Sequence, residues 1–80
     1  MDRTLPQPLE IWHHFSGNDY LILVIAMNCT NGGDHQSYVV YKRIDLDNIY
    51  IRRIDEFMSE VDHEKYPDVK QKYRFVKREW

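Results

Sequence analysis

Three polar side chains in this sequence have the types and spacing to bind an anion. His14 lies near the N-terminus, Arg52 near the middle and Arg74 near the C-terminal end. On adjacent strands they would converge at one end of a small barrel, where guanidinium groups suit phosphate or carboxylate. In the competing interpretation, both arginines instead hold a helical turn onto the sheet. Their partners would then be the acidic residues Asp55, Glu56 and Glu60.

Aromatic side chains give a second signal, because a share of 14% exceeds what the core of so small a protein can hold. Tyrosine and tryptophan beside arginine form stacking surfaces for a base or a proline-rich peptide. For any single tyrosine, a surface position with an exposed hydroxyl is the simpler explanation. The side chains that we predict to bind a ligand are Trp12, His14, Tyr20, Tyr41, Tyr50, Arg52, Arg53 and Arg74.

The sequence argues against catalysis and against a metal centre. His13 and His14 are adjacent, so on a strand they face opposite sides and cannot chelate one ion. No serine, cysteine or aspartate has a spacing that suggests a catalytic triad. We therefore predict a protein that is not an enzyme and needs no cofactor.

Composition narrows the class of protein further. Eighty residues form one domain, and its formal charge of −2 gives no global field for a long nucleic acid. The longest apolar run, residues 21–27, is far shorter than the roughly twenty residues that span a bilayer. Cys29 is the only cysteine, which excludes an intramolecular disulfide. We expect a cytoplasmic protein without a membrane segment.

Alternation of apolar and polar residues predicts five strands. The first is stopped by the turn sequence Ser-Gly-Asn-Asp at residues 16–19, which indicates a hairpin. The second is so apolar that we expect it to be central, with both faces covered. The predicted strands cover residues 11–15, 20–28, 36–44, 49–52 and 73–76.

A change of period after Arg53 predicts about two helical turns that end near Asp62, with one face formed by Ile54, Phe57, Met58 and Val61. Residues 63–72 are polar and contain Pro67, which indicates a surface excursion. Residues 1–10 contain two prolines and no periodicity, so we predict an extended arm. Residues 11–80 then form a single small five-stranded β-barrel, with an open sheet plus one helix as the second choice.

The motifs also resemble a bacterial and phage family known as domain of unknown function 1653. The family pattern is Tyr-Arg-His-Phe-Lys-Gly, Tyr, Ile-Ala, Val-Val-Tyr, Trp-Val-Arg-Pro, Phe and Arg-Phe. The matching stretches are Trp12 to Gly17, Tyr20, Ile25-Ala26, Val39 to Tyr41, Tyr50 to Arg53, Phe57 and Arg74-Phe75. Ser16, Tyr50 and Arg53 depart from the family, which has Lys, Trp and Pro there. The resemblance implies an SH3-like barrel and a phage or bacterial host cell.

Two functions remain in view. The first is a non-enzymatic binder of a small anionic, nucleotide-like ligand, which in a phage would sequester a host signal. The second is an SH3-like interaction module that docks a peptide or partner protein. Surplus aromatics and Trp80 leave apolar surface to bury, so we also expect a homo-oligomer with a deeper pocket between subunits.

Overall fold

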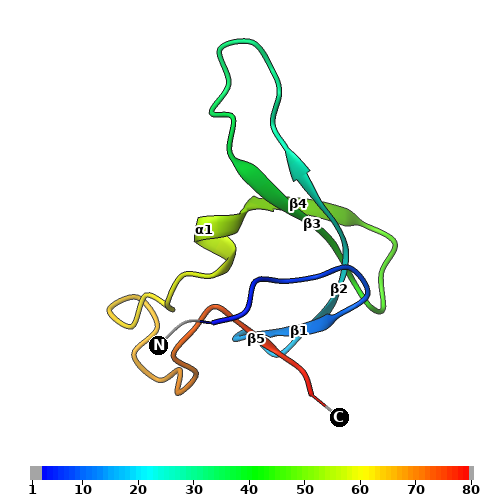
Figure 1. Cartoon of the computed structure of the whole chain (residues 1–80). Helices are drawn as coiled ribbons and strands as arrows, with labels where there is room; N and C mark the ends of the chain where they lie inside the picture. The colour runs from blue at the N-terminus through cyan, green and yellow to red at the C-terminus, as the bar shows by residue number, and fades with distance from the viewer. Residues whose placement is uncertain (1–2, 80) are drawn as a thin grey trace.

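Five strands and one short helix make up the protein, and the computed structural model describes residues 3–79 (Figure 1). Trp80 lies outside the described residues. The strands are β1 Ile11–His14, β2 Asp19–Met27, β3 Ser37–Arg43, β4 Ile49–Arg53 and β5 Phe75–Lys77. The helix α1, Ile54–Phe57, follows β4 without a break. The prediction of a mainly β chain with five strands and one helical turn is confirmed.

The strands form one antiparallel sheet in the order β4-β3-β2-β1-β5, which places β2 at its centre as predicted. The edge strands β4 and β5 do not pair, so the sheet is open and the predicted barrel is not confirmed. Side chains join the two edges instead. Phe57 of α1 stacks on Phe75 of β5 with ring centroids 4.0 Å apart, and an isolated bridge joins Glu60 to Tyr73.

The turn between β1 and β2 forms the predicted hairpin. Gly17 has a φ of 107°, which a side chain would disfavour. Its N–H donates to the carbonyl of His14 at 2.9 Å, and the His14 N–H donates to the carbonyl of Asn18 at 2.8 Å. This turn holds His14 in place as the last residue of β1.

One face of the sheet carries the core. Its central cluster consists of Trp12, Ile22, Val39, Tyr41, Phe57 and Phe75. Phe57 and Val61 are buried, and Ile54 and Met58 are partly buried against the core, so all members of the predicted apolar helical face point inward. The helix itself is shorter than predicted and ends at Phe57. It ends there because residues 58–60 turn toward the bridge with Tyr73.

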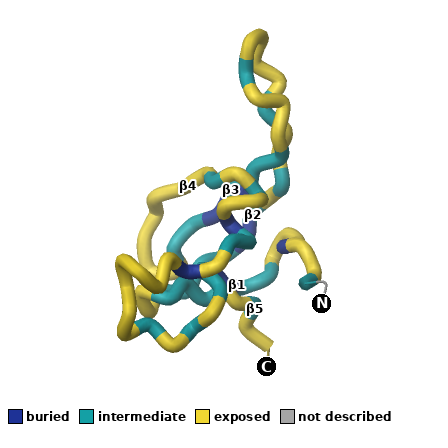
Figure 2. The backbone as a smooth tube through the Cα atoms, turned by 90° about the vertical axis from the view of Figure 1, so that its left-hand side faces the viewer, coloured by how far each residue is buried: buried dark blue, intermediate teal, exposed yellow. Residues whose placement is uncertain are grey.

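The outer face of β2 is exposed, so the prediction that both faces are covered is wrong. Ile22 is fully buried, whereas Val24, which follows a register shift and pairs with Val40 on the outer face, is 46% exposed. The helix and the N-terminal segment pack on the core side only. The β2–β3 hairpin also projects away from the rest of the fold, as Figures 1 and 2 show, so no layer covers its far end.

Residues 3–10 run along the sheet. Pro6 is buried, and the Leu9 N–H donates to the carbonyl of Ile22 at 2.9 Å. The Arg3 guanidinium lies 3.8 Å from the ring centroid of Tyr73 and donates to the carbonyl of Phe75. The segment thereby covers part of the β5 edge. Among residues 3–79, no helix is long and apolar enough to cross a membrane.

Candidate functional site

Five rings, one from each of the five strands, form an aromatic cluster on the core side of the sheet. They belong to His14, Tyr20, Tyr41, Tyr50 and Phe75. Tyr20 joins them: its ring centroid lies 5.3 Å from Tyr41, 5.8 Å from Phe75, 6.2 Å from His14 and 6.3 Å from Tyr50. Most of these pairs are edge-to-face, the arrangement that aromatic quadrupoles favour.

The aromatic cluster has a buried floor and an accessible rim. Phe75 is 1% and Tyr41 4% exposed, so these two rings form the floor. Tyr50 is 37% exposed, and His14 and Tyr20 are half-buried. Burial beside Tyr41 and Tyr50 raises the pKa of Tyr20, so its hydroxyl stays a neutral donor at physiological pH. The rim is therefore accessible to solvent, while the floor keeps the rings in place.

Arg52 lies over this floor with its charge partly engaged. Its guanidinium carbon is 5.8 Å from the ring centroid of Phe75, and its Nε donates to the Tyr41 hydroxyl at 3.2 Å. Its Nη1 pairs with the carboxylate of Glu56 at 3.0 Å. Arg52 therefore pairs with Glu56, one of the three acidic residues expected as partners if the arginine holds the helical turn onto the sheet. Within residues 3–79, its Nη2 makes no hydrogen bond.

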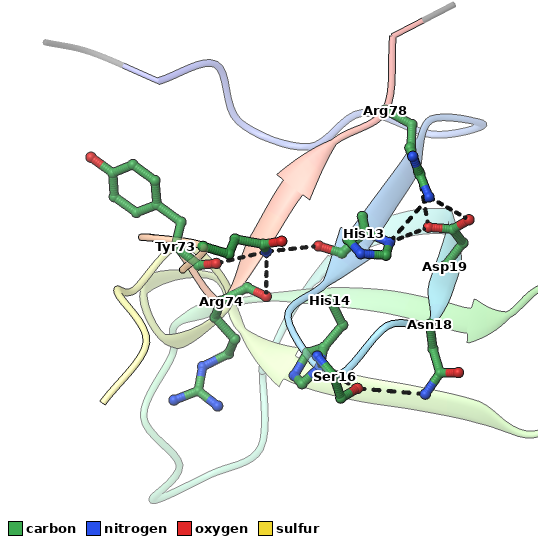
Figure 3. Close-up of polar contacts among 9 residues, drawn as sticks. His13, His14, Ser16, Asn18, Asp19, Tyr73, Arg74 and Arg78 are labelled. Atoms are coloured by element: carbon green, nitrogen blue, oxygen red, sulfur yellow. Dashed lines mark hydrogen bonds and ion pairs between the residues drawn. The ribbon is translucent and has the colours of Figure 1, made fainter. Parts of the chain in front are cut away.

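Arg74 is the less neutralised of the two arginines. Its Nε donates to the Ser59 hydroxyl at 3.3 Å. Neither terminal nitrogen has a hydrogen-bond or ion-pair partner among residues 3–79, and Figure 3 shows its guanidinium reaching out on the same side as His14. Arg74 thus has two donors available for a ligand.

The His14 imidazole is neutral. Burial, and then the positive charges of Arg52 and Arg74, lower its pKa from 6.5 to about 4. The His14 ring centroid lies 4.8 Å from that of Phe75, the ring over which Arg52 also lies, and Arg74 precedes Phe75 in the chain. The Ser16 N–H donates to Nδ1 at 3.1 Å and the Ser16 hydroxyl lies 2.8 Å from the same atom. Nδ1 is therefore the acceptor, and Nε2 carries the proton.

His13 points away from His14, as predicted for adjacent strand residues (Figure 3). Its Nδ1 lies 2.7 Å from a carboxylate oxygen of Asp19, which also accepts a hydrogen bond from Arg78 Nε at 3.1 Å. The hydrogen bond from His13 and the charge of Arg78 lower the pKa of Asp19. This second polar group ties the chain after β5 to β2 and is separate from the aromatic cluster.

Two predicted binding residues lie elsewhere. Trp12 is 1% exposed, and its Nε1 donates to the Glu10 carboxylate at 3.0 Å, so it is a core residue. Arg53 lies on the outer face of β4, as its alternation with Arg52 requires, and pairs with Asp55 at 3.3 Å. The remaining predicted residues lie together: His14, Tyr20, Tyr41, Tyr50, Arg52 and Arg74.

Three residues of the site were not predicted from the sequence. Phe75 supplies the floor, and its place in an alternating apolar stretch was the available signal. Ser16 sets the His14 tautomer, but in the sequence it indicates only a turn. The Gln71 amide donates to the carbonyls of His13 at 3.3 Å and Tyr73 at 2.8 Å, which fixes the segment that carries Arg74. No sequence signal marked Gln71.

The site has donors and stacking surfaces. Within residues 3–79, histidine, cysteine, aspartate and glutamate form no group of three or more that could hold a metal ion. The hydrogen-bond donors that it offers are guanidinium N–H groups, an imidazole N–H and tyrosine hydroxyls.

Fold and site together define a small, mainly β protein with an arginine-flanked aromatic cluster on one sheet face. The chain belongs to the family described as protein of unknown function (DUF1653), whose model matches residues 10–77. The match begins at Glu10 and ends at Lys77, so it includes all five strands and the whole aromatic cluster. No curated protein and no solved structure matches the chain significantly.

Proposed function

We propose that the protein is a non-enzymatic binder of a small anionic ligand that carries a planar ring, of the nucleotide class. The observation that supports this most is that Arg52 and His14 both lie against Phe75, with Arg74 next to Phe75 in the chain and the accessible rings of Tyr20 and Tyr50 nearby. Guanidinium groups bind phosphate through paired donors, and aromatic rims stack on a base. In a phage or its host, such a protein would sequester a signalling nucleotide.

The local charge supports an anion. The chain as a whole carries a formal charge of −2, yet the rim of the aromatic cluster holds two arginines and one paired carboxylate, Glu56. The side chain of Glu56 is 51% exposed, so it can swing aside when a ligand phosphate takes its place on Arg52. A neutral His14 adds a donor without adding a desolvated charge.

The second candidate is an SH3-like module that docks a peptide on the same rim. The exposed ring of Tyr50 and the half-buried ring of Tyr20 favour it, because neighbouring accessible tyrosines can hold a proline-rich segment. The two functions differ in the role of the arginines. Only the nucleotide binder needs both Arg52 and Arg74 for affinity.

Titration calorimetry with a graded set of probes tests the proposal. The set consists of inorganic phosphate, a nucleoside, mononucleotides, cyclic mononucleotides and cyclic dinucleotides. We expect no heat with the nucleoside and the tightest binding with a probe that has both phosphate and base. Native mass spectrometry of the protein purified from its host shows which member of that class co-purifies.

Matched variants then locate the site. Arg52→Gln and Arg74→Gln each remove one charged contact, so we expect binding to weaken tenfold or more. Arg53→Gln lies on the opposite face of the same strand and should change affinity less than twofold. Equal losses in all three variants would indicate a general charge effect. Binding of a proline-rich peptide, with no nucleotide binding, would replace this function with the second candidate.

A further inference from the structure

The outer edge of β4 is open. In the sheet order, β4 is bounded by β3 on one side, and no strand among residues 3–79 pairs with its other side. The other edge strand, β5, is only three residues long, and Arg3 covers the carbonyl of Phe75. Natural edge strands are usually blunted by lysine, proline or a bulge, because exposed backbone groups invite pairing. Residues 49–51, Ile-Tyr-Ile, contain none of these devices.

The outer face beside that edge is apolar and uncovered. Ile49 is 61% and Ile51 65% exposed on β4, and Val24 is 46% exposed on β2. Ile51 pairs in register with Val40 of β3, which pairs with Val24 of β2, so the apolar residues form a row across three strands. A shallow cavity of about 190 Å³ lies at the end of this row, lined by Ala26, Met27, Asn28, Tyr38, Val40 and Ile51. A continuous apolar patch of this kind marks an interaction surface.

We propose that a second copy of the chain pairs antiparallel with β4, so that two sheets join into one across a two-fold axis at Ile51. Antiparallel pairing that keeps both faces continuous must place inward residues opposite inward residues. A register centred on Ile51 satisfies this and pairs every residue of Ile49–Arg53 with a strand residue of the other copy. A self-complementary patch is what a two-fold dimer requires.

The charges fit this register. On the outer face, Arg53 lies opposite Ile49 of the second copy, two residues from Asp47 in the loop that precedes β4. On the inner face, Arg52 lies opposite Tyr50 of the second copy, which suits a cation–π contact. Each contact occurs twice because of the symmetry. The alternative register centred on Arg52 would place two arginines directly opposite each other and is disfavoured.

The dimer also extends the candidate site, and this part rests on the proposed function. Tyr50 and Arg52 are the members of the site that lie on β4, so pairing brings the same two residues of the second copy to its open side. The rim then continues from one copy into the next. A ligand with two phosphates or two bases would contact both copies, which favours dinucleotides over mononucleotides.

Disulfide trapping tests the register. Paired residues of antiparallel strands have Cα atoms about 4.5–5.5 Å apart, within the range that a disulfide bridges. In a Cys29→Ser background, Ile51→Cys should form a covalent dimer rapidly under mild oxidation, because the two positions meet on the axis. Val76→Cys is the matched control, since Val76 is 39% exposed on the other edge strand. Equal trapping at both positions would overturn the proposal.

Sedimentation equilibrium tests the dimer itself without a ligand. We expect the wild-type chain to be dimeric at micromolar concentration and Ile51→Lys to be monomeric, with an unchanged circular dichroism spectrum. A wild-type monomer at these concentrations, or a dimer that persists in Ile51→Lys, would refute the interface. A monomer that still binds nucleotide would leave the proposed function intact, whereas a dimer that binds none would leave only the interface.

Discussion

The two faces of β4 differ in what their arginines do. Arg52 points inward, contacts Tyr41 and lies over Phe75, whereas its neighbour Arg53 points outward and contacts Asp55. The inner face combines cations with fixed rings, and the outer face combines exposed isoleucines with one cation. Adjacent residues of identical type therefore serve different surfaces. The difference shows that position on a strand, more than residue type, decides whether an arginine belongs to a site.

The largest expected difference between the inner and outer faces is in how much one side chain contributes to the free energy of unfolding. Phe75→Ala removes the floor of the inner face and should lower the free energy of unfolding by about 3–5 kcal/mol. Ile51→Ala on the outer face should cost less than about 1 kcal/mol, because its side chain is already 65% exposed. Urea unfolding of both variants at low protein concentration measures the contrast. Similar losses would show that the outer face is also packed.

Lowering the pH should reduce the free energy of unfolding through His14 on the inner face. The pKa of His14 is about 4 in the folded chain, against 6.5 for an ordinary histidine, so the folded state favours the neutral ring. Stability from this group is complete above pH 6.5 and is lost as the pH falls toward 4. We expect a loss of about 1–2 kcal/mol over that window, because the half-buried ring stays partly screened by solvent.

The control for this pH effect is His14→Gln, which should flatten the stability profile between pH 6.5 and 4. Asp19 has a lowered pKa through its hydrogen bond with His13, so its contribution is lost in a more acidic window. A profile of His14→Gln that matches the wild type between pH 6.5 and 4 would contradict the assignment. A bound anion raises the pKa of His14, so the loss of stability should then be smaller. For the same reason the anion should bind more tightly as the pH falls.

The two arginines should differ in stability as well as in binding. Arg52→Ala removes the hydrogen bond to Tyr41 and the contact with Glu56, which we expect to cost about 1 kcal/mol. Arg53→Ala breaks an exposed pair and should change stability by less than about 0.5 kcal/mol. Thermal unfolding of both variants checks the difference. If Arg52→Ala unfolds the chain altogether, Arg52 is foremost a structural residue.

The smallest effect concerns the tautomer of His14. Ser16→Ala removes the hydroxyl beside Nδ1 but leaves the backbone N–H donor in place. We expect the pKa of His14 to change by less than one unit and the fold to be unaffected. Nuclear magnetic resonance titration of the imidazole protons measures both. A ring that switches its proton to Nδ1 in this variant would show that the hydroxyl, not the amide, sets the tautomer.

Much of the fold was predictable from the sequence, because local patterns are strong in this chain. Alternation located all five strands, and the turn at Gly17 was correctly placed. The length of α1 was not predictable, since the chain leaves the helix to form the bridge between Glu60 and Tyr73. The open sheet was only the second choice after a closed barrel. Alternation alone does not show whether edge strands meet.

The candidate site was predictable in part. His14 and Arg52 both lie against Phe75, which follows Arg74 in the chain, and the tyrosines of the rim lie beside it. That these side chains bind a ligand stays a prediction. Trp12 was included because it is an aromatic strand residue, but its side chain faces the core beside Phe57. The supporting roles of Ser16 and Gln71 depend on turn geometry, which residue types do not show.

The sequence by itself determined the strands, their faces and the family, because apolar periodicity and motif order are local properties of the chain. It also determined that Arg52 and Arg53 face opposite ways. Only the tertiary structure decided which rings meet over Phe75, which arginine keeps free donors, and that β4 remains an open apolar edge. These features depend on contacts between residues far apart in the chain, where small changes in sheet curvature decide what touches.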